Sequence, residues 1–335
     1  MLSNKASWFS TTVMRAVVVN KFGGSEVLEI KRNVPIPKPK ENEVLVKVAA
    51  VGVNPVDVYI RSGNYSKLPT LPYIPGNDVC GTVVHVGGDV KNYQEGDRVC
   101  SFRTSSGAYG EYTSICSKYL IKLPEDYDFV KGAAVGTPYL TAYRALIQKA
   151  NFKPGQTILI HGASGGVGMA ATQLAISKGM NVIGTAGTEE GMKMVRENGV
   201  KYVFNHREEG YASSVMSATG GQGVDGVIEM LSNVNLARDL DMLAPKGMVL
   251  VVGSRGSIEI NPRAMMGRET NIQGVALGSS PDEDLREASL AVEVGLKQGW
   301  LNPVIGPKYS LNDVQQAHED IIHNTGSKGK MVLII

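Results

Sequence analysis

Short apolar runs alternate with amphipathic segments through the middle of the chain. The runs are too short for helices and predict buried strands at residues 157–160, 181–184, 202–204, 224–229, 248–252 and 271–276. Between them, apolar residues recur at helical spacing at residues 167–178, 189–197, 209–218 and 236–243. Strands that alternate with helices predict a parallel sheet covered on both faces, which is a doubly wound α/β fold.

The first part of the chain has a different pattern, with short strands separated by turns. Strands are expected at residues 14–20, 27–31, 43–51 and 79–86, after the turn at 95–99, and over 107–114. Three closely spaced prolines, Pro35, Pro37 and Pro39, exclude regular structure after the second of these strands. This part of the chain therefore reads as an all-β module.

The pattern changes near Asp128. Residues 129–146 have helical periodicity, and Pro138 is expected to divide them into two helices. After the α/β region, the sequence predicts helices at residues 282–298 and 311–321 and a final strand at 330–335. This tail is too long to be only a cap on the parallel sheet, so we expect it to return to the β module.

The expected organisation is thus a discontinuous β-rich domain and an inserted α/β domain. The β-rich domain would comprise residues 14–137 and 279–335, the α/β domain residues 138–278, and residues 1–13 would be an N-terminal extension. A ligand cleft is expected between the two domains, at the carboxyl ends of the parallel strands.

The turn HGASGGVG, residues 161–168, follows an apolar strand and leads into a helix, which is the context of a dinucleotide-binding fingerprint. Gly165 leaves room for the backbone to approach a pyrophosphate, and Gly168 lets the helix pack closely on the strand. The amides and the dipole of the helix N-terminus would attract the phosphates. Ala163 replaces the usual first glycine. The alternative is an ordinary βα turn, in which glycine only serves the tight backbone.

The end of the second parallel strand indicates which nucleotide is bound. NAD sites usually carry an acid about 20 residues after the glycine turn, but the sequence here, IGTAGT, contains no carboxylate. This favours NADPH, with Lys193, His206 and Arg207 as candidates to bind the 2′-phosphate. The alternative for these side chains is a solvated surface. Glu189 and Glu190 oppose the NADPH assignment unless they only complement a helix dipole.

Composition excludes several classes of protein. A formal net charge of +2 gives no electrostatic argument for nucleic-acid or membrane binding. The chain has three cysteines, which is too few for a four-cysteine zinc site and indicates a reducing compartment such as the cytoplasm. Residues 1–13 lack acids and contain several Ser and Thr residues, so a mitochondrial presequence is an alternative to a cytosolic tail.

These motifs together resemble the medium-chain dehydrogenase/reductase superfamily, and within it the zeta-crystallin group of NADPH:quinone reductases. The resemblance covers the chain from Met14 to its end. The sequence runs that carry it are GVNPVDVYIRSGNY (52–65), GTPYLTAYRAL (136–146), HGASGGVG (161–168), GTAGTEEG (184–191), VFNHREE (203–209), IEMLSNVNL (228–236), VVGSRGSIEINPR (251–263) and GWLNPVIG (299–306).

The resemblance implies a GroES-like catalytic domain joined to a Rossmann domain, and NADPH-dependent quinone reduction, associated in this group with one-electron transfer. It also implies a cytosolic homotetramer, and it brings two roles of another class, binding of AU-rich RNA and a structural role in the lens. The implied cofactor contacts are Tyr59 near the nicotinamide, Ser164, Gly165, Gly166 and Val167 at the pyrophosphate, Gly187 and His206 at the adenosine phosphate, and Asn235, Val252, Gly253, Ser254, Arg255, Val275, Ala276 and Leu277 along the remaining groove.

Zinc-containing members of this superfamily bind the metal through Cys, His and Cys. The position of the first ligand here reads Asn54-Pro55, and the loop that carries the His in those enzymes reads PGND, so no metal is expected. Without a Lewis acid, an already electrophilic acceptor such as a quinone is favoured over an alcohol. A reductase of enones or other activated alkenes would use the same cleft.

Three residues are candidates for the substrate site: Asn54 and Tyr59 in the cleft wall, with Tyr65 behind them. Each has a structural alternative. Asn54 is equally suited to cap the helix that is expected to begin at Pro55. Tyr65 is suited to packing, since a tyrosine ring buries a large apolar area.

Overall fold

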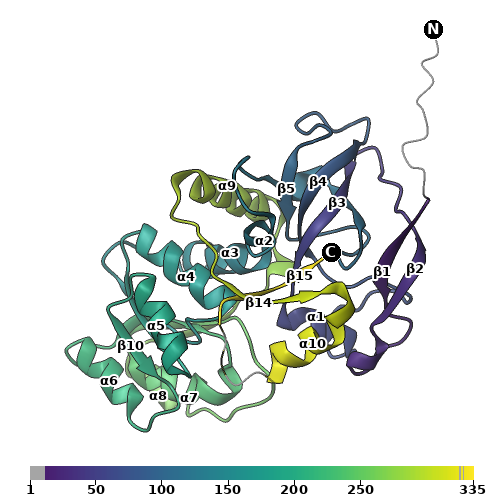
Figure 1. The fold of residues 1–335 in the computed structure, drawn as a ribbon. Coiled ribbons are helices and arrows are strands. Elements are labelled where there is room, and N and C mark those ends of the chain that lie inside the picture. Colours follow the sequence, from purple (N-terminus) through teal and green to yellow (C-terminus); the bar gives the residue numbers. More distant parts are fainter. Residues whose placement is uncertain (1–11, 324–325, 327) are drawn as a thin grey trace.

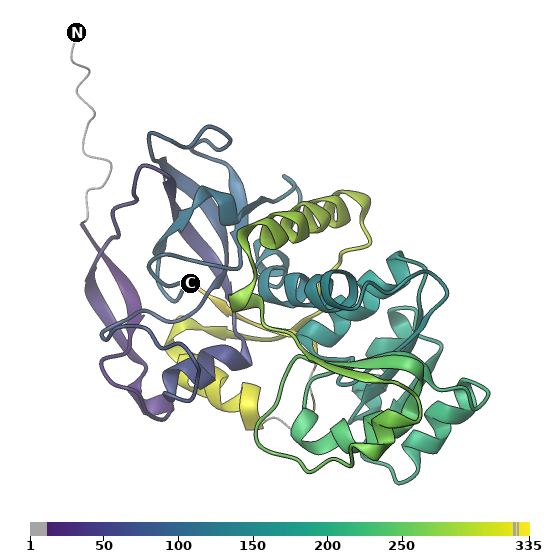
Figure 2. The ribbon, with the colours of Figure 1, turned by 180° about the vertical axis from the view of Figure 1, so that it is seen from behind.

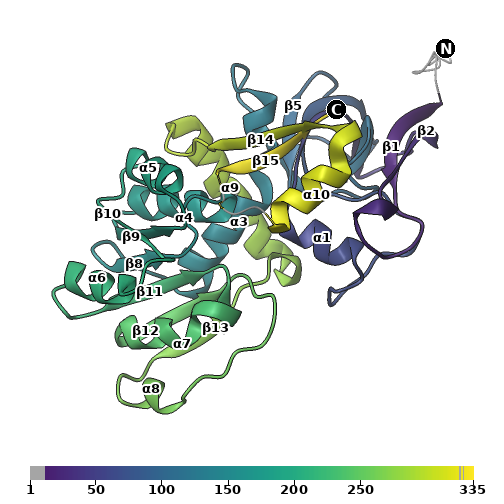
Figure 3. The ribbon, with the colours of Figure 1, turned by 60° about the horizontal axis from the view of Figure 1, so that its bottom comes forward.

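The computed structural model describes residues 12–323, 326 and 328–335. Its α/β half contains a six-stranded sheet in the order β10-β9-β8-β11-β12-β13, in which every pairing is parallel. Figure 3 shows these strands stacked in that order. The strands are β8 (Thr157–Ile160), β9 (Asn181–Ala186), β10 (Tyr202–Asn205), β11 (Val224–Glu229), β12 (Leu243–Val251) and β13 (Asn271–Gly274). The order reverses between β8 and β11, as in a doubly wound dinucleotide-binding sheet, which confirms the predicted fold class.

Helices cover both faces of this sheet. On one face, α4 and α5 pack on β8, β9 and β10, with α3 against α4 and α9 against α3, whereas α6 and α7 cover the other face. The helices that pack on or beside this half are α3 (Gly136–Tyr143), α4 (Gly166–Ser177), α5 (Glu189–Glu197), α6 (Tyr211–Ala218), α7 (Ser232–Met242), α8 (Arg263–Met266) and α9 (Asp282–Gln298). The short helix α2 (Phe129–Gly132) packs against the sheet of the β-rich half. Apolar side chains on both faces explain why these strands read as continuous hydrophobic runs.

The β-rich half contains a seven-stranded sheet in the order β14-β15-β3-β4-β5-β7, with β6 paired to β3. A separate hairpin pairs β1 with β2. The elements are β1 (Val13–Val18), β2 (Glu29–Pro35), β3 (Glu43–Gly52), α1 (Pro55–Arg61), β4 (Asp78–Val86), β5 (Arg98–Ser101), β6 (Tyr112–Cys116), β7 (Leu120–Lys122), β14 (Ile305–Ser310), α10 (Val314–His323) and β15 (Lys330–Ile334).

The C-terminal tail returns to the β-rich half. β15 pairs antiparallel with β3, and α10 packs against α1. The yellow tail lies beside the purple segments both in Figure 1 and from behind in Figure 2. A β-rich domain assembled from two separate chain segments was expected. The residue boundaries given above for the domains, and the cleft between them, stay predictions.

Several details differ from the sequence-based expectations; strand β7 and helix α8, for example, were not predicted. Pro138 does not divide the helices: the break lies between α2 and α3, and Pro138 sits in the first turn of α3, where its missing N–H breaks no hydrogen bond. Helix α7 begins at Ser232, four residues before the first helical residue expected from the apolar pattern. Strand β14 was not predicted, since its alternation is interrupted by Gly306 and Pro307.

Two further expectations concern the chain's surroundings. Among the described residues, no helix is both long enough and apolar enough to cross a bilayer. Of the expected N-terminal extension, residues 1–11 lie outside the described part, and β1 already begins at Val13.

Candidate functional site

The glycine turn connects β8 to α4. Gly165 is the N-cap of α4 and has no side chain to cap it, and the first helical turn contains no acid. The first amides of a helix have no intrahelical partner, so this N-terminus presents donors and a positive dipole end. A Cβ atom on Gly168 would lie 2.2 Å from the Gly162 carbonyl oxygen, so only glycine permits the close packing of this turn.

The C-terminal tail touches the same turn. The Gly329 amide donates a hydrogen bond to the Ser164 carbonyl at 2.7 Å, and Gly165 and Gly329 form an isolated parallel bridge. A Cβ on Gly166 would lie 3.2 Å from Lys330 Cδ. The turn is therefore held against the start of β15, which brings the β-rich half next to the expected phosphate site.

Lys330 belongs to a group of four residues, here called the lysine cluster: the buried Asn54, Asp78 and Lys330 and the partly buried Thr137. Lys330 Nζ donates to Asn54 Oδ1 and lies 3.2 Å from Asp78 Oδ2. The second oxygen of Asp78 accepts hydrogen bonds from the Thr137 amide (2.7 Å) and hydroxyl (2.6 Å). Asp78 is fully buried and Lys330 is 5% exposed, so the ammonium and the carboxylate neutralise each other away from water.

Asn54 is fixed by this cluster and by the helix that follows it. Its Nδ2 donates to Asp78 Oδ2 at 2.9 Å, while its backbone N–H donates to the Asp57 carboxylate at 2.9 Å. Asn54 is also the N-cap of α1, and Pro55 stands in the first turn of this helix. This is the position expected if Asn54 serves to cap the helix. Both ends of the amide are thus engaged by the protein, and a direct contact of Asn54 with substrate stays a prediction.

A second buried chain of polar groups continues from Asp57. The Tyr109 hydroxyl donates to Asp57 at 3.4 Å and lies 3.0 Å from His318 Nε2. Burial raises the pKa of Asp57 to about 7. Burial, with Arg61 nearby, lowers the pKa of His318 to about 3, so this imidazole is neutral. These groups tie α1 to α10 and hold the segment that carries Asn54.

The two candidate tyrosines occupy different environments. Tyr59 is partly buried on α1, and Tyr65 lies in the following loop with 39% of its surface exposed. No contact joins either ring to the lysine cluster among the described residues. Their roles at the substrate site stay predictions.

The end of β9 carries positive groups in place of an acid. A Cβ on Gly187 would lie 2.8 Å from Arg207 Nε and 2.9 Å from His206 Nε2, so both side chains lie directly over this glycine. Burial, followed by the effects of His161 and Arg207, lowers the pKa of His206 to about 4. Lys193 points elsewhere: its side chain is 72% exposed and lies 3.9 Å from Glu197. Its phosphate role stays a prediction.

The two acids that opposed the NADPH assignment are engaged by cations. Glu189 pairs with Arg196 at 3.2 Å, and Glu190 pairs with Lys328 of the tail. Both stand in the first turn of α5, where they complement the helix dipole. Neither therefore competes with a phosphate over Gly187.

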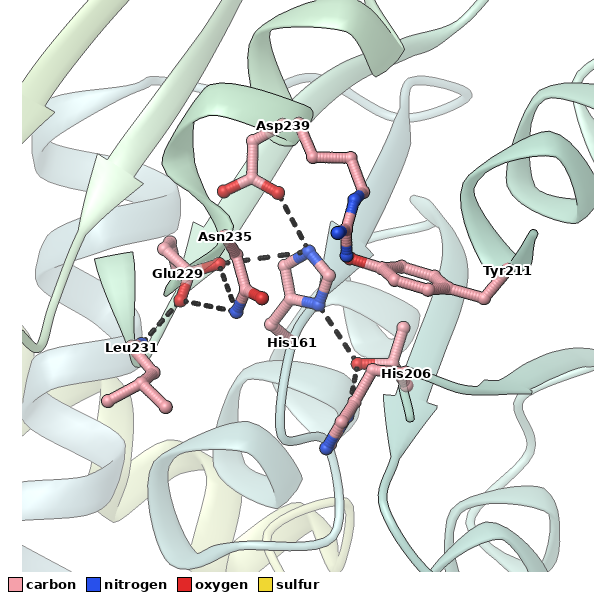
Figure 4. A network of polar contacts seen from close by, with 9 residues as sticks. His161, His206, Tyr211, Glu229, Leu231, Asn235 and Asp239 are labelled. Carbon is pink, nitrogen blue, oxygen red and sulfur yellow. Dashed lines mark hydrogen bonds and ion pairs between the residues drawn. The ribbon is translucent and has the colours of Figure 1, made fainter. Parts of the chain in front are cut away.

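Beneath this end of the sheet lies a second buried group, here called the imidazole cluster: His161, Thr185, Glu229 and Asp239 (Figure 4). His161 Nε2 lies 2.9 Å from Asp239 Oδ1 and 3.7 Å from Glu229 Oε2, and His161 Nδ1 lies 3.0 Å from the Thr185 hydroxyl. Burial raises the pKa of both carboxyl groups to about 7 and lowers that of His161. The sequence did not indicate that these residues form a cluster, because they are distant in the chain and no motif spacing joins them.

The remaining predicted cofactor contacts gather around Glu229. Asn235 Nδ2 donates to its carboxylate at 3.2 Å, and the Val252 and Gly253 amides donate to its backbone carbonyl at 2.9 and 3.2 Å. The residues placed at this same sheet edge, at the ends of β12 and β13, are Val252, Gly253, Ser254, Arg255, Val275, Ala276 and Leu277. Arg255 also donates to the Ile322 carbonyl of the tail at 3.0 Å.

Three members of the imidazole cluster, His161, Glu229 and Asp239, form the group of potential metal ligands found among the described residues. Their ligand atoms lie within 4.8 Å of one another. The atoms of the cluster hydrogen-bond to one another, and within the described part only Asp239 Oδ2 lacks a partner. Three buried groups that are already engaged by protein atoms do not require a cation. That the protein binds no metal stays a prediction.

The arrangement fits a dinucleotide. An uncapped helix N-terminus faces the expected pyrophosphate, and the side chains of Arg207 and His206 cover Gly187. All of them lie at the carboxyl ends of parallel strands, where open α/β sheets bind ligands.

Comparison with known proteins agrees with this geometry. Two domain families match: an alcohol dehydrogenase GroES-like domain over residues 40–125 and a zinc-binding dehydrogenase over residues 166–293. Quinone oxidoreductases of Homo sapiens and Pongo abelii are each 52% identical over 323 residues, covering 96% of this chain and 98% of theirs. The structure of Escherichia coli quinone oxidoreductase complexed with NADPH matches with a TM-score of 0.86 and 32% identity, over 96% of this chain and 100% of that one.

Proposed function

The chain belongs to the quinone oxidoreductase family of the medium-chain dehydrogenase/reductase superfamily, and we propose that it is an NADPH-dependent quinone reductase that works without zinc. When bound, NADPH supplies the reducing equivalents. The protein supplies binding, orientation and exclusion of water.

The observation that carries the proposal is the lysine cluster. Asn54 stands where related dehydrogenases have their first zinc ligand, and it is bound to a buried ammonium and to Asp78. A metal cation at this point would have to compete with the Lys330 ammonium for the side-chain oxygens of Asn54 and Asp78. The site is therefore suited to an acceptor that needs no Lewis acid, and a quinone is such an acceptor.

Each part of the site has a distinct task. The amides at the start of α4 bind the pyrophosphate, and His206 with Arg207 binds the 2′-phosphate. The lysine cluster joins the β-rich half to the glycine turn and fixes the orientation of Asn54. We place the quinone between the two halves, next to Tyr59, whose hydroxyl is suited to donate a hydrogen bond to a quinone oxygen.

The direct test is oxidation of NADPH by the purified protein with an ortho-quinone in the presence of a chelator. We expect turnover that the chelator does not change; a strict requirement for added zinc would refute the proposal. Gly165→Val, which puts a side chain into the pyrophosphate site, should weaken NADPH binding by about 100-fold or more. Gly267→Val is the matched control, because a Cβ on Gly267 meets nothing within 4 Å.

An activated alkene is the second acceptor that this site suits, since reduction of an enone also needs no metal. A panel that contains quinones and enones of similar size separates the two: the better substrate has the higher kcat/KM.

The finer parts of the proposal rest on the resemblance. They are one-electron transfer, a homotetramer and a cytoplasmic location. Oxygen consumption during turnover tests the first, the mass of the protein in solution the second, and the N-terminus of the mature protein in cells the third. For the alternative of AU-rich RNA binding, absence of a gel shift at low salt would remove it.

A further inference from the structure

Thr185 lies between two imidazole rings, those of His161 and His206, which are far apart in the sequence. Its hydroxyl oxygen is 3.0 Å from His161 Nδ1 and 3.3 Å from His206 Nδ1, and Thr185 is fully buried in β9. A hydroxyl group carries one hydrogen, so it donates to one ring and accepts from the other. The direction of this pair of bonds fixes which nitrogen of His206 carries the proton.

The buried carboxyl groups decide that direction. His161 Nε2 lies 2.9 Å from Asp239 Oδ1 and 3.7 Å from Glu229 Oε2, whereas His161 Nδ1 faces the Thr185 hydroxyl at 3.0 Å. Because the carboxyl oxygens lie at Nε2, this nitrogen carries the proton and donates to Asp239 Oδ1.

The remaining bonds follow in order. A neutral His161 with its proton on Nε2 has a bare Nδ1, which accepts from the Thr185 hydroxyl. The Thr185 oxygen then accepts from His206 Nδ1–H. His206 is left with a bare Nε2, and this is the nitrogen that lies over Gly187.

We propose that Thr185 and His161 are specificity-determining positioning residues: they set the tautomer of His206, so that Nε2 takes up a proton when the 2′-phosphate of NADPH arrives. The inference rests on the proposed function and extends it. A bare nitrogen beside a phosphate dianion is repulsive, whereas a protonated one donates a charge-assisted hydrogen bond. NADH has no 2′-phosphate and gains nothing from this proton.

The surrounding charges permit this change. Burial, and after it the charge of Arg207, disfavours the imidazolium form of His206 in the free protein. The acids of α5, Glu189 and Glu190, are already paired with Arg196 and Lys328. From α7, Arg238 faces Tyr211 at 3.3 Å and lowers the pKa of Asp239. A phosphate over Gly187 would supply the negative charge that His206 lacks.

The principal test is a double-mutant cycle read as the ratio of kcat/KM for NADPH to kcat/KM for NADH. Thr185→Val should lower this ratio by about tenfold, the typical worth of a hydrogen bond to a charged group. Thr185→Ser, which keeps the hydroxyl, should retain it. His206→Ala should lower the ratio at least as much. When Thr185→Val is added to His206→Ala, it should have no further effect on the ratio. Thr113→Val is the control, a fully buried threonine of β6 outside the site.

The outcomes separate the inference from the proposed function. If His206→Ala changes the ratio but Thr185→Val does not, or if their effects add, the positioning role is wrong. If His206→Ala leaves the ratio unchanged, the 2′-phosphate assignment itself fails, and the inference fails with it.

A second measurement needs no variant. Titration calorimetry of the wild-type protein in two buffers of different ionisation enthalpy gives the protons taken up on binding. At a pH above the second pKa of the phosphate, about 6, NADPH should take up more protons than NADH. Equal uptake by the two cofactors would overturn the inference.

Discussion

The lysine cluster and the imidazole cluster are both buried, yet they balance charge in different ways. In the lysine cluster, the Lys330 ammonium faces the Asp78 carboxylate, and every strong donor has an acceptor. The imidazole cluster has two acids and one neutral imidazole, with Arg238 on the neighbouring position of α7. Burial raises the pKa of both acids to about 7 and so favours their protonated forms. The first cluster should therefore be sensitive to loss of its cation, and the second to pH.

The largest effect is expected from Lys330→Met, which leaves the fully buried Asp78 carboxylate without its counter-ion. We expect a loss of about 3–5 kcal/mol in the free energy of unfolding, measured by denaturant titration. Lys328→Met is the matched control: this lysine is 43% exposed in its pair with Glu190, so its loss should cost about 1 kcal/mol or less.

The double variant Lys330→Met/Asp78→Asn sharpens this prediction, because it removes both charges. It should recover part of the lost stability. If Lys330→Met is no more destabilising than Lys328→Met, the lysine cluster is not the charge-balanced unit described here.

The next effect concerns pH. The folded protein holds the protons of Glu229 and Asp239 more tightly than the unfolded chain, since burial raises both pKa values to about 7. Their contribution to stability is complete below about pH 4 and is lost as the pH rises towards 7. Asp239→Asn removes one of the two acids. As the pH rises over this window, the free energy of unfolding of this variant should fall less than that of the wild type, and the difference should be about 2–3 kcal/mol.

The difference between the two curves isolates Asp239, because the contributions of other shifted groups such as Asp57 are common to both proteins. Two of those groups, His206 and His318, titrate with the opposite sign. Their lowered pKa values give a contribution that is present above about pH 6.5 and lost on acidification. Asp241→Asn, a change of an exposed acid on the same helix, is the control. Parallel curves for the wild type and Asp239→Asn would contradict the prediction.

The smallest effect is expected from Lys193→Ala. Its exposed ammonium lies beside Glu197, so its attraction to a phosphate over Gly187 is screened by solvent. We expect KM for NADPH to rise about twofold and KM for NADH to stay unchanged. If Lys193→Ala raises KM for NADPH as much as His206→Ala does, this prediction is wrong and Lys193 is a principal ligand of the phosphate.

Motif and periodicity were sufficient for much of the fold and for part of the site. The run before HGASGGVG and the helix after it predicted the βα turn, because local spacing alone produces this geometry. The missing acid after β9 likewise predicted positive groups near Gly187. The same reasoning named Lys193, His206 and Arg207 as candidates. His206 and Arg207 lie over Gly187, whereas the Lys193 side chain is exposed beside Glu197.

Other features were invisible in the sequence. Lys330 and Asn54 are separated by most of the chain and meet only because β15 pairs with β3. His161, Thr185, Glu229 and Asp239 each follow or belong to different elements, and no fixed spacing joins them. Burial, which shifts their pKa values, is a property of the assembled core.

The sequence by itself determined the parallel sheet, the glycine turn and the likeness to quinone reductases, because periodicity and glycine positions are local and are written directly in the residue order. Tertiary structure alone decided which polar groups are buried, which of them form a buried ion pair and which acids have raised pKa values. Those outcomes depend on long-range strand pairing, and the energy of a charge depends on the neighbours that the fold brings to it.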